Sequence, residues 1–326
     1  MKQDTIKNRV VGVDISVDCT TYAIVDVRGN IIAQDSFCTG DYYNASEYAS
    51  VLSERIITMA EANGGYEAIR SVGMSSPSGN YLTGSIENPP NLHWPGVTPM
   101  AALMRDRLGI AVALANDAHV SALGEHAFGC AHGMENFVVL TLGTGIGSCI
   151  FSRGNVHLGT DGFAGEFGHT CLVHDGRTCG CGLKGCVEAY CGHKGIIITA
   201  EELMAESQEP SLMRNIDDLS PRTICECCEQ GDKLAIEVFR RTGHMFGIAL
   251  ANYASIVDPE AIIFTGGIAK AGHWLLDPTN EAFEANVFHN LRGRVKLIRS
   301  ALNGHDRDVL GASALAWGIK EYSLFK

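Results

Sequence analysis

The chain has 326 residues, 46% of them hydrophobic and 19% charged, so it is long enough for two compact domains and too apolar for a disordered protein. The formal net charge is −12 and no run of lysine or arginine stands out, which excludes a basic surface for nucleic acid. No apolar signal segment opens the chain and no run approaches the roughly 18 apolar residues of a membrane span, so we expect a cytoplasmic protein without a membrane partner.

The N-terminal part predicts three strands joined by short turns, followed by alternating helices and strands. Apolar runs predict strands, and apolar residues three or four apart predict helices. The long loop between residues 75 and 96 is rich in Ser, Pro, Gly and Asn, and its length indicates a function. The expected elements are strands at 10–15, 22–25, 31–33, 69–74 and 110–115, and helices at 46–62 and 98–108.

The remainder of the chain repeats the theme of strand, glycine-rich turn and strand, first near Asp14 and again near Gly143. The expected elements are helices at about 118–128, 234–256 and 309–322, and strands at 137–142, 148–151, 261–265 and 295–299. Alternating strands and helices indicate the α/β class, and the repeated unit suggests two related halves with a cleft between them. We place a small domain at 1–115, completed by a C-terminal helix at about 305–326, and a large domain at 116–304.

One segment, from residue 169 to residue 186, has the spacing of a metal site. Cys179, Cys181 and Cys186 fall within eight residues and alternate with glycines, which let the backbone curl so that several sulfurs converge. His169 supplies a fourth donor. Because Cys₃His is a closed tetrahedral set without a position for water, we predict a structural Zn²⁺ ion and not a zinc hydrolase.

Other cysteines and histidines compete for this role. His174 ranks second to His169 as the nitrogen donor, and Cys171 and Cys191 are further candidates. The alternative to a metal is a group of buried free thiols in a tight loop. The closely spaced cysteines of Cys225–Cys228 lie in an expected helical region without a nearby histidine, so we interpret them as buried core residues.

The same region resembles the signature of the ROK family of sugar kinases and sugar-responsive repressors. The matching residues are Gly165-Glu166-Phe167-Gly168-His169 and Cys179-x-Cys181-Gly-x-x-Gly185-Cys186-x-Glu188, with further matches at 116–118, 141–147, 265–268 and 310–312. The resemblance spans nearly the whole chain. It implies an actin-like ATPase (ribonuclease H-like) fold with two domains around a nucleotide cleft. Because the first strand begins at Val10, we expect no helix-turn-helix domain and therefore the kinase branch.

The resemblance assigns roles to individual residues. It makes Asp117 the general base, since a carboxylate within reach of a sugar hydroxyl can accept its proton. Helix capping is the alternative for Asn116-Asp117, and solvated surface charge is the alternative for Glu166 and Glu188. His169 would be shared between zinc and a sugar hydroxyl. The implied sugar-binding residues are Asn91, Asn116, Asp117, Glu166, His169 and Glu188.

The resemblance also implies ATP, with Mg²⁺ to screen its phosphates. The turn at Gly143–Gly147 can direct N–H groups at phosphate oxygens, although an ordinary hairpin turn has the same composition. Gly266-Gly267 follows a buried strand and would approach the adenosine, or it forms an ordinary strand-to-helix turn. The expected nucleotide-binding residues are Asp14, Thr144, Gly145, Gly266 and Gly267.

The first phosphate loop departs from the family pattern Asp-x-Gly-Gly-Thr, because it reads Asp14-Ile15-Ser16-Val17-Asp18. Without glycines the turn does not easily adopt positive φ. An added carboxylate about 4 Å from a phosphate would cost about 4 kcal/mol at an effective dielectric of about 20, unless Asp18 points outward or holds Mg²⁺.

Two hypotheses about function follow. The first is ATP-dependent phosphorylation of glucose or a related hexose or N-acetylhexosamine, and the second is a sugar-binding protein that is catalytically weak or silent. Trp94 in the long loop is either a platform for the sugar or a core residue. Family members are commonly dimers or tetramers, so we expect a homodimer or homotetramer whose partners are a sugar and ATP.

Overall fold

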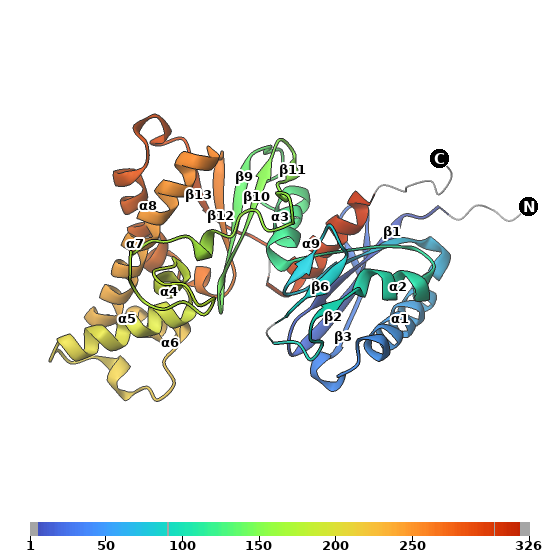
Figure 1. Ribbon diagram of the computed structural model, residues 1–326, viewed down its shortest axis with the longest axis horizontal. Coiled ribbons are helices and arrows are strands. Elements are labelled where there is room, and N and C mark those ends of the chain that lie inside the picture. The colour runs from blue at the N-terminus through green and yellow to red at the C-terminus, as the bar shows by residue number, and fades with distance from the viewer. Residues whose placement is uncertain (1–5, 90, 303, 320–326) are drawn as a thin grey trace, which may run out of the picture. The chain divides into compact units, whose positions relative to one another are not determined.

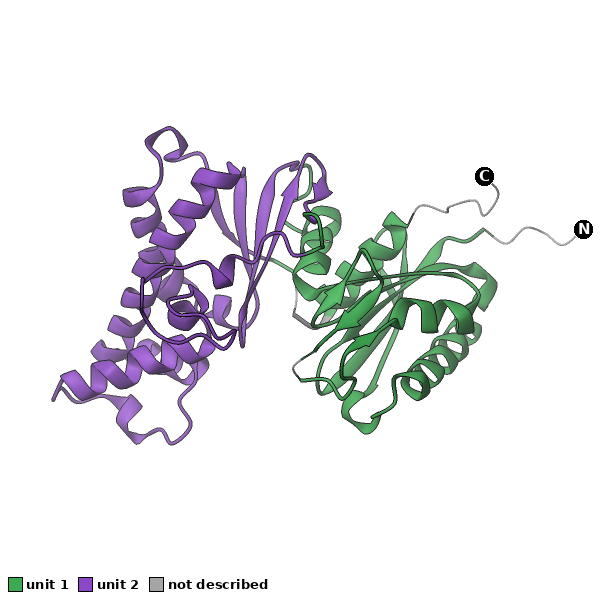
Figure 2. Ribbon diagram, in the orientation of Figure 1, with its two compact units in different colours: residues 1–133, 159–162, 301–326 green, residues 134–158, 163–300 purple. Residues whose placement is uncertain are grey.

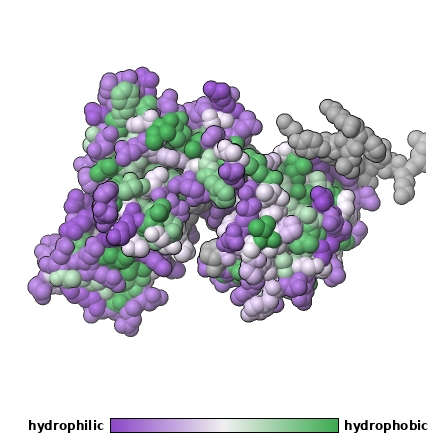
Figure 3. Space-filling model, viewed as in Figure 1, coloured by the Kyte–Doolittle hydropathy of each residue, from purple (hydrophilic) through white to green (hydrophobic). Residues whose placement is uncertain are grey.

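The computed structural model describes residues 6–89, 91–302 and 304–319. The chain forms two compact units (Figure 2): unit 1 comprises residues 1–133, 159–162 and 301–326, and unit 2 comprises residues 134–158 and 163–300. On the face shown in Figure 3, hydrophilic and apolar residues are interspersed over each unit. Among the described residues, no helix combines the length and the apolar character needed to cross a lipid bilayer.

Unit 1 is built on a five-stranded sheet with the strand order β3-β2-β1-β4-β8 (Figure 1). The first three strands are an antiparallel meander, and β4 and β8 continue the sheet in parallel with β1. The strands are β1 Arg9–Ile15, β2 Cys19–Asp26, β3 Ile31–Cys38, β4 Ile69–Ser75 and β8 Ala111–Ala115. β3 extends beyond the expected end at residue 33, because an edge strand can carry polar, exposed residues that break the apolar pattern.

Helices cover both faces of this sheet. α1 (Ala45–Ala62) and α2 (Met100–Leu108) pack on one face, and α3 (Asp117–Phe128) and α9 (Gly304–Gly318) belong to the other. Side chains of β1 alternate between the two layers: Val11 and Val13 pack with α1 and α2, whereas Val10 packs with α9.

Glycines let α9 lie directly against the sheet and against α3. A Cβ at Gly12 would lie 2.1 Å from the carbonyl oxygen of Val309, and one at Gly311 would lie 2.4 Å from that of Val120. α3 therefore stays with unit 1, and our boundary between residues 115 and 116 was too early: the units divide after residue 133. α9 starts at Gly304, earlier than expected, and residues 320–322 of the expected helix lie outside the described residues.

The long loop of unit 1 contains a small three-stranded sheet that the sequence did not predict. Its strands are β5 Gly79–Asn80, β6 Ser85–Glu87 and β7 Val97–Thr98. Trp94 is buried, and its Nε1 donates a hydrogen bond of 3.0 Å to the carbonyl oxygen of Tyr42. Trp94 is therefore a core residue that ties the loop to the segment before α1.

Unit 2 repeats the sheet of unit 1, with the strand order β11-β10-β9-β12-β13. Three antiparallel strands are again followed by two parallel ones. The strands are β9 Phe137–Leu142, β10 Ile146–Ser152, β11 Asn155–Val156, β12 Ala261–Thr265 and β13 Lys296–Arg299. The shared pattern confirms the α/β class and the duplication inferred from the sequence.

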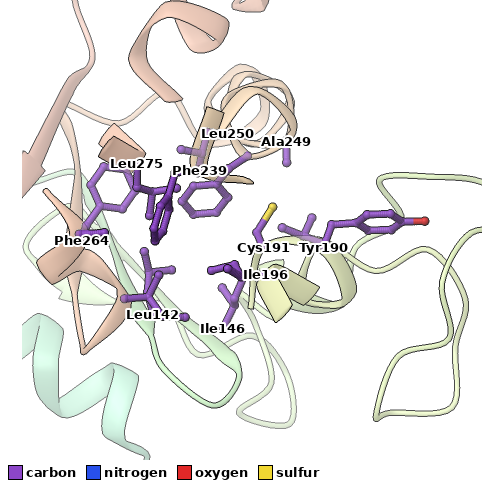
Figure 4. Close-up of a cluster of buried hydrophobic side chains, with 14 of the residues drawn as sticks. Leu142, Ile146, Tyr190, Cys191, Ile196, Phe239, Ala249, Leu250, Phe264 and Leu275 are labelled. Carbon is purple, nitrogen blue, oxygen red and sulfur yellow. The ribbon is translucent and has the colours of Figure 1, made fainter. Parts of the chain in front are cut away.

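The core of unit 2 forms between its sheet and its helices. Leu142 and Ile146, which flank the glycine-rich turn, pack together with Phe239 and Leu250 of α7 (Figure 4). Cys227 and Cys228 of α6 are buried in the same cluster, which confirms our interpretation for these two, whereas Cys225 is only partly buried and lines a cavity. The helices are α4 Glu188–Cys191, α5 His193–Glu206, α6 Pro221–Glu229, α7 Lys233–Val257 and α8 His273–Asn286.

Candidate functional site

The four residues of the expected metal site come together in unit 2. One ligand atom from each of His169, Cys179, Cys181 and Cys186 lies within 4.8 Å of the others. The sulfurs of Cys181 and Cys186 are 3.8 Å apart, and Cys179 Sγ lies 3.7 Å from His169 Nδ1. Sulfurs at two corners of a tetrahedron with Zn–S bonds of about 2.3 Å would be about 3.8 Å apart. The arrangement is therefore compatible with a structural zinc ion.

A tight hairpin brings the three cysteines together. The N–H of Cys179 donates to the carbonyl oxygen of Leu183 at 2.8 Å, and Gly182 closes the turn with a φ of 88°. At Gly185, with a φ of 79°, a Cβ would lie 1.8 Å from the carbonyl oxygen of Val173. The glycine at 185 is thus required both by the backbone conformation and by the close approach of the chain.

The competing ligands lie outside this cluster. The side chain of His174 is 93% exposed and its Nδ1 lies 3.1 Å from the carboxylate of Asp175, so it is not the nitrogen donor. Cys191 is buried among apolar residues (Figure 4) and donates to the carbonyl oxygen of Thr242. All twelve cysteines lie within the described residues, and each is free of a disulfide.

The segment that carries Glu166 and His169 is anchored from behind by β10. Ser148 Oγ accepts the N–H of Phe167 at 3.0 Å and donates to the carbonyl oxygen of Gly165. A Cβ at Gly168 would lie 2.4 Å from the carbonyl oxygen of Ile146. Glu166 is exposed, so for this residue the alternative of solvated surface charge stays open.

Glu188 joins the metal loop to the glycine-rich turn. Its Oε2 accepts the N–H of Ile146 at 2.9 Å, and the Cys179 thiol donates to its Oε1 at 3.5 Å. A Cβ at Gly145 would lie 2.5 Å from Oε2, so a larger residue would displace the carboxylate. Glu188 is half-buried, which rules out the alternative of a solvated surface charge for this residue.

A cavity of about 680 Å³ lies within unit 2, next to the glycine-rich turn. Gly143 and Thr144 line one part of it, and Gly267 and Ile268 line another. Gly266, with a φ of 91°, brings β12 so close to β9 that a Cβ would lie 2.3 Å from the carbonyl oxygen of Leu142. The cavity lies within the size range of ligand pockets, and it unites two of the predicted nucleotide segments.

Asn116 and Asp117 mark the start of α3 in unit 1. Asn116 Oδ1 accepts the N–H of His119 at 2.9 Å, so this side chain caps the helix. Asp117 Oδ1 accepts the N–H of Ala118 at 2.9 Å, and the side chain keeps contact with solvent. Asn91 is also in unit 1 and is exposed. The capping alternative therefore holds for Asn116, while the carboxylate of Asp117 retains an open side.

Three carboxylates of unit 1 influence one another. Desolvation by the surrounding protein raises the pKa of Asp117, and the negative charge of Asp308 raises it further. Desolvation and Asp308 likewise raise the pKa of Asp14 to about 7, against a lowering by the Ser75 hydroxyl. Asp308 itself pairs with Arg307 at 2.7 Å. Shifted carboxyl pKa values of this kind are typical of functional sites.

The first phosphate loop closes without glycine. Ser16 and Cys19 end a tight turn in which the N–H of Ser16 donates to the carbonyl oxygen of Cys19 at 3.0 Å, and Ser16 Oγ donates to the same oxygen at 2.7 Å. None of the described residues between Asp14 and Thr20 has a positive φ. The absence of glycine therefore does not prevent closure, and Asp18 is exposed at the tip.

Comparisons with known proteins identify the family of this chain. The ROK family model matches residues 10–319. The chain belongs to the ROK family. This ROK protein is 30% identical to the glucokinase of Halalkalibacterium halodurans over 95% of the chain and 94% of the relative. It is 25% identical to the xylose repressor of Bacillus subtilis over 94% of the chain, but over only 76% of that repressor.

A solved structure supports the same placement. The ROK family glucokinase from Streptomyces griseus, in complex with glucose and AMPPNP, matches 95% of this ROK protein and 99% of its own chain, with a TM-score of 0.76 and 28% identity. The family and the actin-like ATPase fold inferred from the sequence are thereby confirmed.

Sequence reasoning missed several residues of the ROK protein that surround the predicted ones. Ser148 and Ile146 lie behind the sugar and metal segments, and Asp308 lies near Asp14 and Asp117. The cavity in unit 2 is also lined by polar side chains that carried no motif: His193, Ser220, Arg222, Glu226, Glu229 and Lys270. In the sequence, the adjacent opposite charges of Arg307 and Asp308 near the start of α9 are a signal for the charge beside Asp14 and Asp117.

Proposed function

We propose that this ROK protein phosphorylates a hexose with ATP as the donor. The observation that carries the proposal is the position of Glu188, whose Oε2 accepts the N–H of Ile146 in the glycine-rich turn and whose Oε1 lies 3.5 Å from the sulfur of Cys179 in the metal loop. A residue of the predicted sugar site is thereby tied to the turn that lines a nucleotide-sized cavity. The similarity to a glucokinase over nearly the full length of both chains supports a kinase.

Asp117 acts in this proposal as the general base. A hydroxyl of the sugar gives its proton to the Asp117 carboxylate as the hydroxyl oxygen forms a bond to the γ-phosphorus, and ADP leaves with the electrons of the broken P–O bond. The raised pKa of Asp117 increases its proton affinity over that of an ordinary carboxylate, while the open side of the residue leaves room for a hydroxyl.

The metal loop has a structural role in this proposal. His169, Cys179, Cys181 and Cys186 would hold Zn²⁺, and the ion would fix the loop that carries the sugar ligands. Because Nδ1 of His169 faces Cys179, Nε2 is left to hydrogen-bond a sugar hydroxyl. Glu166 and Glu188 are the further sugar ligands of this unit, and Asn91, Asn116 and Asp117 are those of unit 1.

The donor nucleotide would occupy the cavity of unit 2. Backbone N–H groups at Thr144 and Gly145 would bind its phosphates, and Gly266 and Gly267 would let the adenosine come close. Lys270, which lines the cavity, would add positive charge. Asp14 of unit 1 is the remaining predicted nucleotide residue, and Mg²⁺ bound with ATP would screen the charge of the phosphates. Free thiols that bind zinc require a reducing compartment, so we place the protein in the cytoplasm. A homodimer or homotetramer remains a prediction.

A second candidate, a sugar-binding protein with weak or no turnover, is favoured by one observation. The N–H groups of Ser16 and Cys19 are both used inside the turn, on Cys19 O and Ser16 Oγ, and are not free for a phosphate. The exposed Asp18 adds negative charge at the same turn.

The two candidates are separated by measuring binding and product in parallel. Glucose, mannose, allose, fructose and the N-acetylhexosamines are titrated calorimetrically, and the same mixtures with Mg-ATP are analysed by mass spectrometry for a sugar phosphate. The kinase predicts a phosphorylated product from at least one sugar that binds. Sugar binding without a phosphorylated product from any of them would contradict the kinase and support the silent protein.

A further inference from the structure

Cys19 and Cys38 face each other across β2 and β3. The register of the two antiparallel strands pairs Cys19 directly with Cys38. Cys19 is also the last residue of the turn that forms the first phosphate loop, since Ser16 N–H and Oγ both donate to its carbonyl oxygen. A bond between these two cysteines would thus connect the phosphate loop to the edge strand of the sheet.

The hydrogen bonds around Cys19 identify the type of this pair. The carbonyl oxygen and N–H of Cys19 both point toward Ser16, on the side of β1. The backbone hydrogen bond to the segment after β3 is made by the residue before Cys19: the N–H of Thr39 donates to the carbonyl oxygen of Asp18 at 3.1 Å. Cys19 and Cys38 are therefore a non-hydrogen-bonded pair. Such pairs have side chains on one face and Cα atoms about 4.5 Å apart, which lies inside the range of disulfides.

Both thiols can be reached by a small reagent. β3 is the edge strand of the sheet, and Cys38 is exposed at its end. Cys19 is partly exposed, and its sulfur has a polar neighbour, Thr21 Oγ1, at 3.9 Å. The sulfur of Cys38 has Gly40 as a neighbour, and glycine has no side chain that could cover it.

We propose that Cys19 and Cys38 form a reversible disulfide that restrains the first phosphate loop. The oxidant is a low-molecular-weight disulfide. The thiolate of Cys38 attacks one of its sulfurs and one small thiol leaves; the thiolate of Cys19 then attacks the Cys38 sulfur of the mixed disulfide and the second small thiol leaves. The two protein thiols are oxidised, the small disulfide is reduced, and the protons of Cys19 and Cys38 end on the two released thiols.

The bond would change the geometry of the loop. Disulfides most often hold Cα atoms about 5.5–6 Å apart, whereas a non-hydrogen-bonded pair places them at about 4.5 Å. Oxidation therefore pushes the turn and the edge strand apart by about 1 Å. A displacement of that size in a catalytic site can lower the rate on the order of 100-fold. Exposed disulfides are easier to reduce than buried structural ones, as a reversible switch requires, and Cys38 is exposed. The effect on rate rests on the proposed kinase function, whereas the bond itself does not.

The test uses the full chain in buffers of oxidised and reduced glutathione. Wild type, Cys38→Ser and Cys171→Ser are alkylated, digested without reduction and mapped by mass spectrometry. Cys171 is also exposed and lies outside the metal ligands, so its variant is the matched control. We expect a crosslinked peptide that joins residues 19 and 38 in wild type and in Cys171→Ser, and its loss on treatment with dithiothreitol. Absence of this peptide at every glutathione ratio would overturn the proposal.

Activity and ADP affinity are measured on the same samples, with zinc content as a check on the metal loop. Oxidised wild type should lose about tenfold or more in kcat/KM for ATP and recover on reduction, while Cys38→Ser keeps its rate under both conditions. Equal losses in wild type and Cys38→Ser would overturn the regulatory role. If no hexose is phosphorylated even by the reduced protein, the kinase fails, and the crosslinked peptide together with a change in ADP affinity still decides the disulfide.

Discussion

At the scale of single residues, the carboxyls of unit 1 show how burial beside like charges changes acid–base behaviour. Asp14 sits at the end of β1, where desolvation and Asp308 raise its pKa to about 7. In the unfolded chain the same carboxyl has a value near 3.8. The folded state therefore holds an extra proton between these two pH values, and folding and protonation are linked.

The sign of this linkage gives a prediction for stability. Because the folded state binds the additional proton, the free energy of unfolding should fall as pH rises from about 4 to 7 and stay level above that range. Asp14→Asn should be more stable than wild type at pH 8 by about 1–2 kcal/mol, a difference that vanishes near pH 4. Urea unfolding without added Mg²⁺ measures it. Asp18→Asn, on the exposed turn, is the control; an equal gain there would show that burial at Asp14 is not the cause.

Asp308 should tune the proposed base. Its negative charge raises the pKa of Asp117, and kinase activity should be lost as pH falls through that pKa because the base becomes protonated. Asp308→Asn removes the charge and should move the acid limb of the kcat profile to lower pH. The readout is kcat from pH 4.5 to 8 with saturating substrates. An acid limb that stays in place in Asp308→Asn contradicts the assignment of Asp117 as the titrating group.

The metal ligands can be tested with a matched pair of cysteines. Cys186 belongs to the cluster, whereas Cys171 lies opposite it in a β-bridge and is exposed. Cys186→Ser should reduce bound zinc to less than about half an equivalent and lower the melting temperature, since structural zinc contributes to folding. Cys171→Ser should retain about one equivalent. Metal analysis of folded protein decides the matter, and equal zinc in both variants would exclude the proposed ligand set.

At the scale of elements, glycines define how the loops and helices fit. Gly185 and Gly182 both have positive φ, but only Gly185 faces a neighbouring backbone, with Val173 O at 1.8 Å from a would-be Cβ. Around Gly182 a Cβ would meet open space. The two positions thus separate the cost of backbone conformation from the cost of a clash.

Alanine at these two glycines should therefore have unequal effects. Gly182→Ala should cost about 1–2 kcal/mol, the penalty of a left-handed conformation. Gly185→Ala should cost about 3 kcal/mol or more and weaken zinc binding, because the hairpin must also open. Equilibrium unfolding and zinc affinity measure both. Similar costs for the two variants would show that the hairpin relaxes around the added methyl group.

The pattern of apolar residues predicted some elements well and missed others for physical reasons. β1 and β12 are buried on both faces, and their continuous apolar runs identify them. α8 was not predicted, because it contains Pro278. Proline is rare inside a helix, so its presence argued against a helix in this segment. In the site, spacing identified the cysteines but could not reveal that Glu188 bonds to Ile146, because those residues are 42 positions apart.

At the scale of the whole molecule, the chain contains two copies of one sheet pattern. The two copies carry different loops and side chains of the predicted site. Unit 1 carries carboxylates after or at the ends of β1 and β8, and unit 2 carries the metal loop, the glycine-rich turn and the cavity. The resemblance noted in the sequence covers the sugar and metal segments, whereas the turn at Ser16–Cys19 lacks the two glycines expected there.

We propose that this chain transfers a phosphoryl group to a hexose with Asp117 as the base. The most direct measurement is the rate of hexose-dependent ADP release from Mg-ATP by wild type and by Asp117→Asn. We predict turnover by wild type with at least one hexose and a fall of about 10²- to 10⁴-fold in kcat for the variant, with sugar affinity retained. Turnover that survives the substitution unchanged, or no hexose-dependent ADP release by wild type, would contradict the account.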